Sequence, residues 1–304
     1  SDAVLRHPGM SDAQALALGD LPQFESKARS LGCSAAMLNS EWAVSAAHCI
    51  SLADEERVTL TYETGGVSNT VAGTAYRVQS GDGGYDDVML IHLDTPITSA
   101  VAWVAPYDRF DEYKQLGWQV GRGTSGALGV NTTSDGQFRA MTQHIYSTIL
   151  GEGSIIPQHI YYNYNNPEVT NPSEYATFYE GGTGPGDSGG PLYVYSRGRY
   201  FNASVVSGPQ DGSYRNSRLS THLPAIIERS NLEFAYPQQL VPRAVWVAED
   251  LIATTADQAT VGTWSDRLAG LTWSSSSDGG AGAPTLRTSL SPTGLAAVRF
   301  DGDD

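Results

Sequence analysis

Short apolar runs separated by turn signals fill most of the chain from Cys33 onward. Runs of this length that are rich in β-branched and aromatic residues are typical of strands, and glycine and proline between them mark turns. The pattern predicts strands at residues 35–38, 42–45, 57–62, 70–78, 88–93, 118–121, 139–149, 191–195 and 201–207. Many short strands with such punctuation indicate an all-β sandwich or barrel.

Little helix is expected. A short helix is predicted around residues 11–18, and a second at 224–231, where Pro224 would occupy the first turn. From about Pro237 the composition shifts toward serine, glycine and aspartate, with strands predicted at 243–248, 259–264 and 295–300. We therefore expect a main domain over residues 1–237 and a β-rich C-terminal tail over residues 238–304.

The net charge of the chain limits the classes of partner that it is expected to bind. The 304 residues carry 33 acidic and 18 basic side chains, a net charge of −15. Such a chain repels nucleic-acid backbones and anionic membrane surfaces, so neither is expected as a partner. No uninterrupted apolar run reaches the 18 or more residues of a membrane-spanning helix, and no span is expected. The 33 glycines fit a turn-rich β protein.

The two cysteines leave the compartment open at this point. Cys33 and Cys49 lie 16 residues apart. They are buried thiols if the protein is cytosolic. If they pair, they close a short loop and indicate an oxidising compartment.

Three islands of sequence carry chemistry. The first is Ala46-Ala47-His48-Cys49 after an apolar strand, and the second is Asp87 at the start of the strand over residues 88–93. The third is the glycine-rich run Gly186-Asp187-Ser188-Gly189-Gly190-Pro191. Glycines there let backbone N–H groups approach a ligand closely, and an exposed serine in such a loop can have its developing oxyanion met by two donors. Each residue alone is more often structural, but the order His, Asp, Ser together with the cysteine pair favours nucleophilic catalysis.

These motifs resemble those of the trypsin/chymotrypsin-like serine proteases over roughly residues 31–231. The runs at residues 120–126 and 139–142 are most similar to secreted bacterial members. The resemblance implies two six-stranded antiparallel β-barrels followed by a short C-terminal helix. It also implies a Cys33–Cys49 disulfide beside the catalytic histidine, and hence a secreted or cell-surface protein.

The resemblance implies a role for each motif residue. Ser188 would be the nucleophile, His48 the general base and then the general acid, and Asp87 the residue that orients His48. The backbone N–H groups of Gly186 and Ser188 would form the oxyanion hole. No cofactor and no metal is expected, and the substrate would be a protein or peptide.

The chain departs from the family pattern near its N-terminus. Family members are usually activated when cleavage frees an Ile/Val-Val-Gly-Gly terminus, whose amine pairs with the aspartate before the serine. No such motif precedes Cys33. Asp187 therefore needs another partner, either a differently processed N-terminus or an arginine.

The primary specificity pocket is expected, by register from Ser188, to have Gly182 at its floor. Its wall would come from Ser207, Gly208 and Pro209, with Arg218 near the far wall and Arg215 close by. A glycine floor offers no carboxylate for Lys or Arg side chains. We expect the pocket to accept small apolar side chains, or acidic ones if an arginine points inward, the alternative being that both arginines face solvent.

The tail resembles the opening of a bacterial laminin-G/concanavalin-like domain, through residues 245–248, 263–267, 283–286 and 298–304. Such a domain would bind a glycan or a protein, and the alternative is a linker whose strands pack on the protease. The leading interpretation of the whole chain is a secreted serine endopeptidase. The alternative is a catalytically idle binding or adhesion protein at the cell surface, built on the protease fold.

Overall fold

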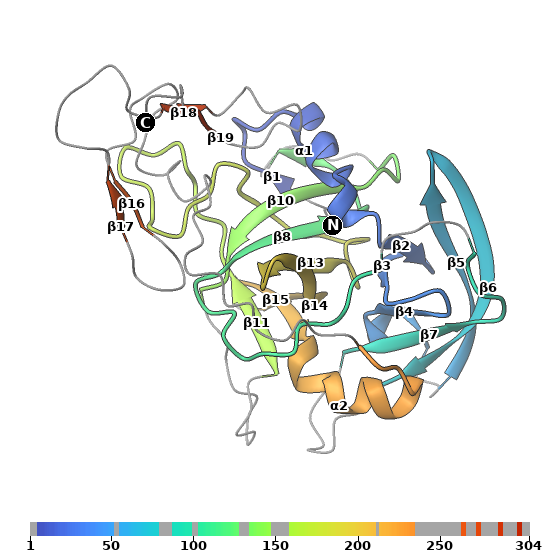
Figure 1. Cartoon of the computed structure of the whole chain (residues 1–304). Helices are drawn as coiled ribbons and strands as arrows, with labels where there is room; N and C mark the ends of the chain where they lie inside the picture. Colours follow the sequence, from blue (N-terminus) through green and yellow to red (C-terminus); the bar gives the residue numbers. More distant parts are fainter. Residues whose placement is uncertain are drawn as a thin grey trace.

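The computed structural model describes most of residues 5–234 and four short strands of the tail (Figure 1). The described ranges are 5–51, 55–78, 87–98, 103–127, 134–146, 158–210, 213–234, 263–265, 272–274, 285–287 and 297–299. Within these ranges no helix is both long and apolar enough to span a bilayer.

Six strands close into the first barrel, drawn in blue to blue-green in Figure 1. They are β2 (Lys27–Ser30), β3 (Cys33–Met37), β4 (Trp42–Ser45), β5 (Glu55–Thr64), β6 (Val67–Arg77) and β7 (Met89–Leu93), and they pair antiparallel in the order β2-β3-β4-β7-β6-β5. Strands β3 and β4 are buried along their whole length, and small residues such as Ala35, Ala36 and Ala43 let both faces pack.

A second antiparallel sheet of six strands curls beside the barrel (Figure 1). It has the order β10-β8-β13-β14-β15-β11, with β8 (Leu116–Gly121), β10 (Arg139–His144), β11 (His159–Tyr162), β13 (Pro191–Ser196), β14 (Arg199–Gln210) and β15 (Ser213–Arg218). The prediction of an all-β fold with two six-stranded units is confirmed. The first unit is a closed barrel and the second a curled half-barrel.

Two α-helices in the described part of the chain flank the sheets. Helix α1 (Asp12–Gly19) begins at Ser11, whose side chain accepts from the Gln14 amide while Gln14 accepts from the Ser11 amide. This reciprocal capping explains why the short helix starts there. Helix α2 (Leu219–Ser230) begins five residues before the predicted start, so Pro224 lies inside it. Its end at Asn231 is in the left-handed conformation that asparagine tolerates. Single 3₁₀ turns form at Pro22–Phe24 and Ala47–Cys49.

Strand β1 (Leu5–Arg6) joins two segments that are distant in sequence. It pairs parallel with β9 (Gly126–Ala127) and antiparallel with β12 (Gly181–Gly182). The amide of His7 extends this pairing by donating to the Glu180 carbonyl at 3.0 Å. The start of the described chain is therefore built into the region just before the Ser188 loop.

The tail contains two small hairpins in its described residues. Strand β16 (Thr263–Ser265) pairs with β17 (Thr272–Ser274), and β18 (Thr285–Arg287) pairs with β19 (Ala297–Arg299). Strands β16 and β19 overlap two of the three predicted tail strands. The third, at 243–248, lies outside the described residues.

One apolar cluster joins the two sheets. It contains Val44 and Leu90 from the barrel and Trp118, Tyr193 and Val205 from the second sheet, all less than 9% exposed. Each large apolar side chain buried in this way contributes about 1.5–3 kcal/mol to the free energy of unfolding. The junction between the sheets is therefore a core in its own right, and the strand ends that meet there are held in fixed positions.

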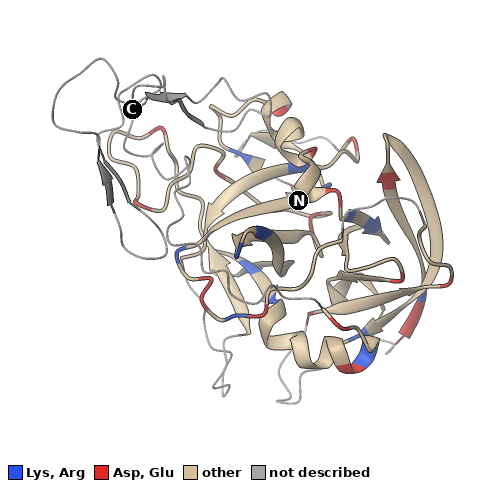
Figure 2. Ribbon diagram, in the orientation of Figure 1, with Lys and Arg blue, Asp and Glu red and all other residues tan. Residues whose placement is uncertain are grey.

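Charged residues of both signs are distributed over both sheets and the loops (Figure 2). Two buried arginines are paired with acids. Arg139 bonds Asp12 and Asp135, each at 2.8 Å, and Arg218 bonds Glu112.

A disulfide joins Cys33 at the start of β3 to Cys49 after β4, as the family resemblance implied. We predict that replacing both cysteines by serine lowers the free energy of unfolding by about 3 kcal/mol, because the loop between residues 16 positions apart gains conformational entropy when unfolded. Urea unfolding of the oxidised chain and the double variant measures this. Equal midpoints for the two would contradict the prediction.

Candidate active site

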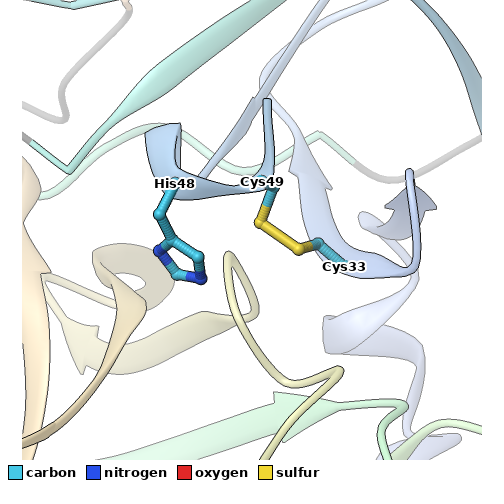
Figure 3. A group of neighbouring side chains, drawn as sticks. All are labelled: Cys33, His48 and Cys49. Atoms are coloured by element: carbon cyan, nitrogen blue, oxygen red, sulfur yellow. A yellow bond between two sulfur atoms is a disulfide. The ribbon is translucent and has the colours of Figure 1, made fainter. Parts of the chain in front are cut away.

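His48 lies in the 3₁₀ turn Ala47–Cys49, directly after β4. Figure 3 shows its ring beside the Cys33–Cys49 disulfide, which holds this turn to the start of β3. The side chain is 34% exposed, and each ring nitrogen has a partner. Nδ1 lies 2.8 Å from Asp87 Oδ2, and Nε2 lies 2.8 Å from Ser188 Oγ.

Asp87 is the buried member of this group, with 1% of its surface exposed. The predicted register places it just before β7, and the structure agrees. Its Oδ1 accepts from the His48 amide at 2.8 Å, so it holds both the ring and the backbone of His48. Ser207 Oγ donates to Oδ2 at 2.5 Å. Three donors therefore surround one carboxylate.

The ionisation of Asp87 follows from these contacts. Burial acts to raise the pKa of Asp87, but the bonds from the His48 ring, Ser207 and the His48 amide outweigh burial and hold the pKa below its usual value. The carboxylate is therefore ionised near neutral pH. It can orient the imidazole of His48 and stabilise the positive charge that forms when His48 takes a proton.

Ser188 lies in a loop that only glycine permits at two points. Gly186 has a φ of +94°, and a Cβ there would lie 2.6 Å from Gly123 Cα. Gly189 has a φ of +76°, and a Cβ there would lie 1.9 Å from Ser45 Oγ. The loop can therefore come close enough to the barrel for Ser188 to reach His48.

The amides of Gly186 and Ser188 are available to a ligand. In the described chain, the backbone bonds of this loop use the amides of Asp187, Gly189 and Gly190 as donors. Neither the Gly186 nor the Ser188 amide donates in that set. Two unused N–H groups beside a nucleophile are what an oxyanion hole requires.

Asp187 has backbone partners. Its carboxylate is fully buried and accepts from the Gly123 amide at 3.1 Å and the Gly184 amide at 3.2 Å. These bonds tie the Ser188 loop to the segment after β8. The sequence led us to expect an N-terminal amine or an arginine at this position, and the two amides are contacts that it did not indicate.

The predicted pocket residues fall into two groups. Gly182 is buried, and a Cβ on it would lie 2.0 Å from the hydroxyl of Tyr214, so the Tyr214 ring lies directly against it. Tyr214 also stacks on Tyr162 with ring centroids 5.4 Å apart. Ser207 is in β14, but its hydroxyl donates a hydrogen bond to the Asp87 carboxylate and does not line the pocket as expected. Gly208 and Pro209 pair with Arg215 and Tyr214 across β14 and β15, so their backbones lie beside Tyr214.

The expectation that Arg218 lines the pocket is wrong. Its side chain is fully buried and donates to both carboxylate oxygens of Glu112, which is also fully buried. A substrate cannot reach it. Arg215 is different, since its Nη2 lies 3.3 Å from Ser207 Oγ. The alternative that both arginines face solvent therefore does not hold either.

Three residues of kinds that often bind metal ions lie close together, but they do not form a metal site. One ligand atom each of Cys33, His48 and Cys49 lies within 4.8 Å of the others. Both sulfur atoms belong to the disulfide, so neither is a thiolate that could bind a metal ion. His48 Nδ1 is also engaged with Asp87.

Two roles in this site were missed from the sequence. Ser207 was expected in the pocket wall but bonds Asp87, and Tyr214 was not considered. Ser207 has no local signal, because its partner is 120 residues away. Tyr214 could have been found only by placing β15 against β14, and the polar sequence of β15 was not predicted as a strand.

A barrel docked on a curled sheet, with serine, histidine and aspartate bonded at the junction, defines the class of trypsin-like serine peptidases. The Trypsin family model matches residues 21–225, about two thirds of the 304 residues. The chain therefore belongs to the trypsin family. No match was found among the curated proteins.

Glu180 is a buried carboxyl group next to Gly181 and Gly182. It accepts from the Asn165 amide and from the amide and hydroxyl of Thr177, each at 2.9 Å. Burial raises the pKa of Glu180 to about 8, although these hydrogen bonds act in the opposite direction. The folded protein therefore keeps a proton on Glu180 at neutral pH.

This proton makes stability depend on pH. An unfolded glutamate releases its proton near pH 4.3, so between there and about pH 8 the unfolded chain binds fewer protons than the folded chain. We predict that the free energy of unfolding falls by up to about 1.4 kcal/mol per pH unit over this window, and that Glu180→Gln removes this component.

Urea unfolding at pH 5 and pH 8 measures the effect, with Glu228→Gln on the exposed face of α2 as the control. A difference between the wild type and Glu180→Gln that is the same at both pH values would contradict it.

Proposed function

We propose that the protein is a serine endopeptidase that hydrolyses peptide bonds through an acyl-enzyme. The observation that carries this proposal is the bonded series from Asp87 through His48 to Ser188, beside the unused amides of Gly186 and Ser188. A buried orienting carboxylate, a general base and a hydroxyl in this order are the parts that acyl transfer needs.

The geometry supports one sequence of steps. Ser188 Oγ attacks the substrate carbonyl while His48 Nε2 takes its proton, and Asp87 stabilises the resulting imidazolium. The amides of Gly186 and Ser188 donate to the oxyanion of the tetrahedral intermediate. His48 then gives the proton to the leaving amine, and a water molecule activated by His48 releases the acyl group from Ser188.

A catalytically idle binding protein remains the alternative. It would need a nucleophile loop that cannot meet an oxyanion, or a histidine turned away from the serine. Both ring nitrogens of His48 are engaged, and the loop amides are unused, which favours the enzyme.

For the residue before the cleaved bond, we propose a small uncharged side chain. The Tyr214 hydroxyl against Gly182 takes up the space where the family's pocket floor lies. No carboxylate among the proposed pocket residues would pair with Lys or Arg. The acidic preference considered from the sequence loses its support from Arg218, which is buried with Glu112.

The setting of the enzyme is also proposed. The Cys33–Cys49 disulfide supports a secreted or cell-surface location, because such bonds persist in oxidising compartments. We propose a protease domain over residues 1–237 and a separate tail over 238–304 that binds a glycan or a protein. The net charge of −15 supports the expectation that nucleic acid is not a partner.

A fluorophosphonate probe tests the nucleophile. We predict covalent labelling of the wild-type chain and its loss in Ser188→Ala, with peptide hydrolysis falling by about 10⁴-fold or more because no other hydroxyl contacts His48 in the described chain. Ser68→Ala, an exposed position in β6, serves as the matched control and should label normally. An unlabelled wild-type chain, before and after limited proteolysis, would favour the idle binding protein.

Cleavage profiling tests the role of Tyr214. We predict that Tyr214→Ala raises kcat/KM for peptides with Phe or Leu before the cut by about 10- to 100-fold relative to Ala, because the removed ring opens apolar space. Tyr214→Phe keeps the ring and should keep the preference for small residues. Tyr195→Ala, which removes an exposed ring from β13, is the control. Wild-type cleavage after Lys or Arg would refute the proposed specificity.

A further inference from the structure

Two arginines, Arg29 of β2 and Arg122 just after β8, point to the same place. A Cβ built on Gly136 would lie 3.8 Å from Arg122 Nη2 and 3.9 Å from Arg29 Nη1. The two guanidinium groups therefore flank one point, and both side chains are only partly exposed. Basic positions on β2 can be followed in Figure 2.

No carboxylate of the described residues forms an ion pair with either of them. Other arginines of the described chain, namely Arg6, Arg57, Arg139, Arg197 and Arg218, each pair with an acid. Arg122 Nε is buried and has no hydrogen-bond partner among the described residues. Burial lowers the pKa of Arg122, and the charge of Arg29 lowers it further. Two facing cations that no described carboxylate neutralises would be stabilised by an anion from outside.

Ser34 connects this arginine pair to the catalytic loop. Arg29 lies directly across from Ser34 in the β2–β3 pairing, so their side chains share a face. Ser34 Oγ accepts from the Arg122 amide at 3.2 Å and donates to the Gly186 carbonyl at 2.9 Å. The Ser34 amide donates to the Ser188 carbonyl at 2.8 Å. The pair therefore lies one residue away from the nucleophile loop.

The arginine pair and the proposed pocket connect to the Ser188 loop through different residues. The Ser188 carbonyl of the loop accepts from the Ser34 amide, and the Gly189 amide of the loop donates to the Val206 carbonyl, at 2.8 Å each. Val206 leads into Ser207 and Gly208, where the acyl part of a substrate would lie. If the acyl part lies there, the leaving part of the substrate would lie toward Ser34, the residue that connects the loop to Arg29 and Arg122.

We propose that Arg29 and Arg122 form an anion subsite that binds a carboxylate in the leaving part of the substrate. A carboxylate accepts two parallel bonds from a guanidinium and relieves the repulsion between the two cations. This inference rests on the proposed peptidase function. The carboxylate belongs either to an acidic side chain or to the C-terminus of a short substrate.

Paired peptides test the subsite. Internally quenched peptides have alanine before the cut and either Glu or Gln at each of the first four positions after it, with a free or an amidated C-terminus. We expect kcat/KM to be about tenfold higher for Glu at one of these positions, or for the free carboxylate, the fold-change that a charge-assisted bond supplies. The position identifies the source of the carboxylate.

Substitutions of the arginines test whether Arg29 and Arg122 cause the preference for the Glu peptide. Arg29→Gln and Arg122→Gln should each bring the Glu and Gln peptides close to equal values of kcat/KM, compared as a ratio within each variant. Arg57→Gln, which removes an equal charge from an exposed pair with Asp94, should keep the tenfold preference. Equal cleavage of all pairs by the wild type, or a preference that persists in the double variant, would overturn the subsite.

A binding measurement separates this inference from the proposed function. Calorimetry with Ser188→Ala should show tighter binding of the Glu peptide than of the Gln peptide, by about tenfold, and Arg122→Gln in that background should abolish the difference. Binding preference without labelling or cleavage would refute the peptidase and keep the subsite. Cleavage without a binding preference would refute the subsite and keep the peptidase.

Discussion

The buried carboxylate of Asp87 is the constraint on which the site depends. A carboxylate with 1% exposure is costly unless several donors satisfy it, and its donors come from both halves of the molecule. His48 belongs to the barrel, whereas Ser207 belongs to the second sheet. Asp87 can therefore be satisfied only when the two sheets are docked. The apolar cluster that includes Val44, Trp118 and Val205 provides that docking.

The same rule explains the other buried charges. Arg218 and Glu112 are both fully buried, and each satisfies the other, with Ser220 as a further donor to Glu112. Removing one partner of such a pair typically lowers the free energy of unfolding by about 3–5 kcal/mol. Arg218 therefore has a structural role. An arginine near a pocket in sequence is thus not evidence of a pocket charge. Whether such an arginine lines the pocket depends on whether its side chain is buried in the fold.

The parts of the fold that could be predicted from sequence have local signals. Short apolar runs marked β4 and β7, a short helix was predicted around residues 11–18, where α1 lies, and the residue types around His48 and Ser188 marked the site. Strand β15 was missed because its sequence, Ser-Tyr-Arg-Asn-Ser-Arg, is polar, and its burial depends on partners elsewhere in the chain. Asn216, for example, donates to Gln119 and Ser204. Strand β2 was missed for the same reason, since Lys27 is buried by donating to the Gly19 carbonyl.

The start of α2 shows a related limit. Proline is favoured in a first turn, which suggested a start at Pro224, yet the helix begins at Leu219 and includes the proline. Tertiary contacts decide here, because the buried side chains of Leu219 and Ile226 belong to the cluster that joins the sheets.

The nucleophile loop is held by the same bonds that join the two sheets. The Ser188 carbonyl is bonded to Ser34 of the barrel, and the Gly189 amide is bonded to Val206 of the second sheet. A Cβ on residue 189 would collide with Ser45, so this close approach of the loop to the barrel requires glycine at that position. The position of Ser188 relative to His48 is therefore a direct consequence of how the sheets dock. A packing change that altered the distance between the sheets would therefore also move Ser188 relative to His48.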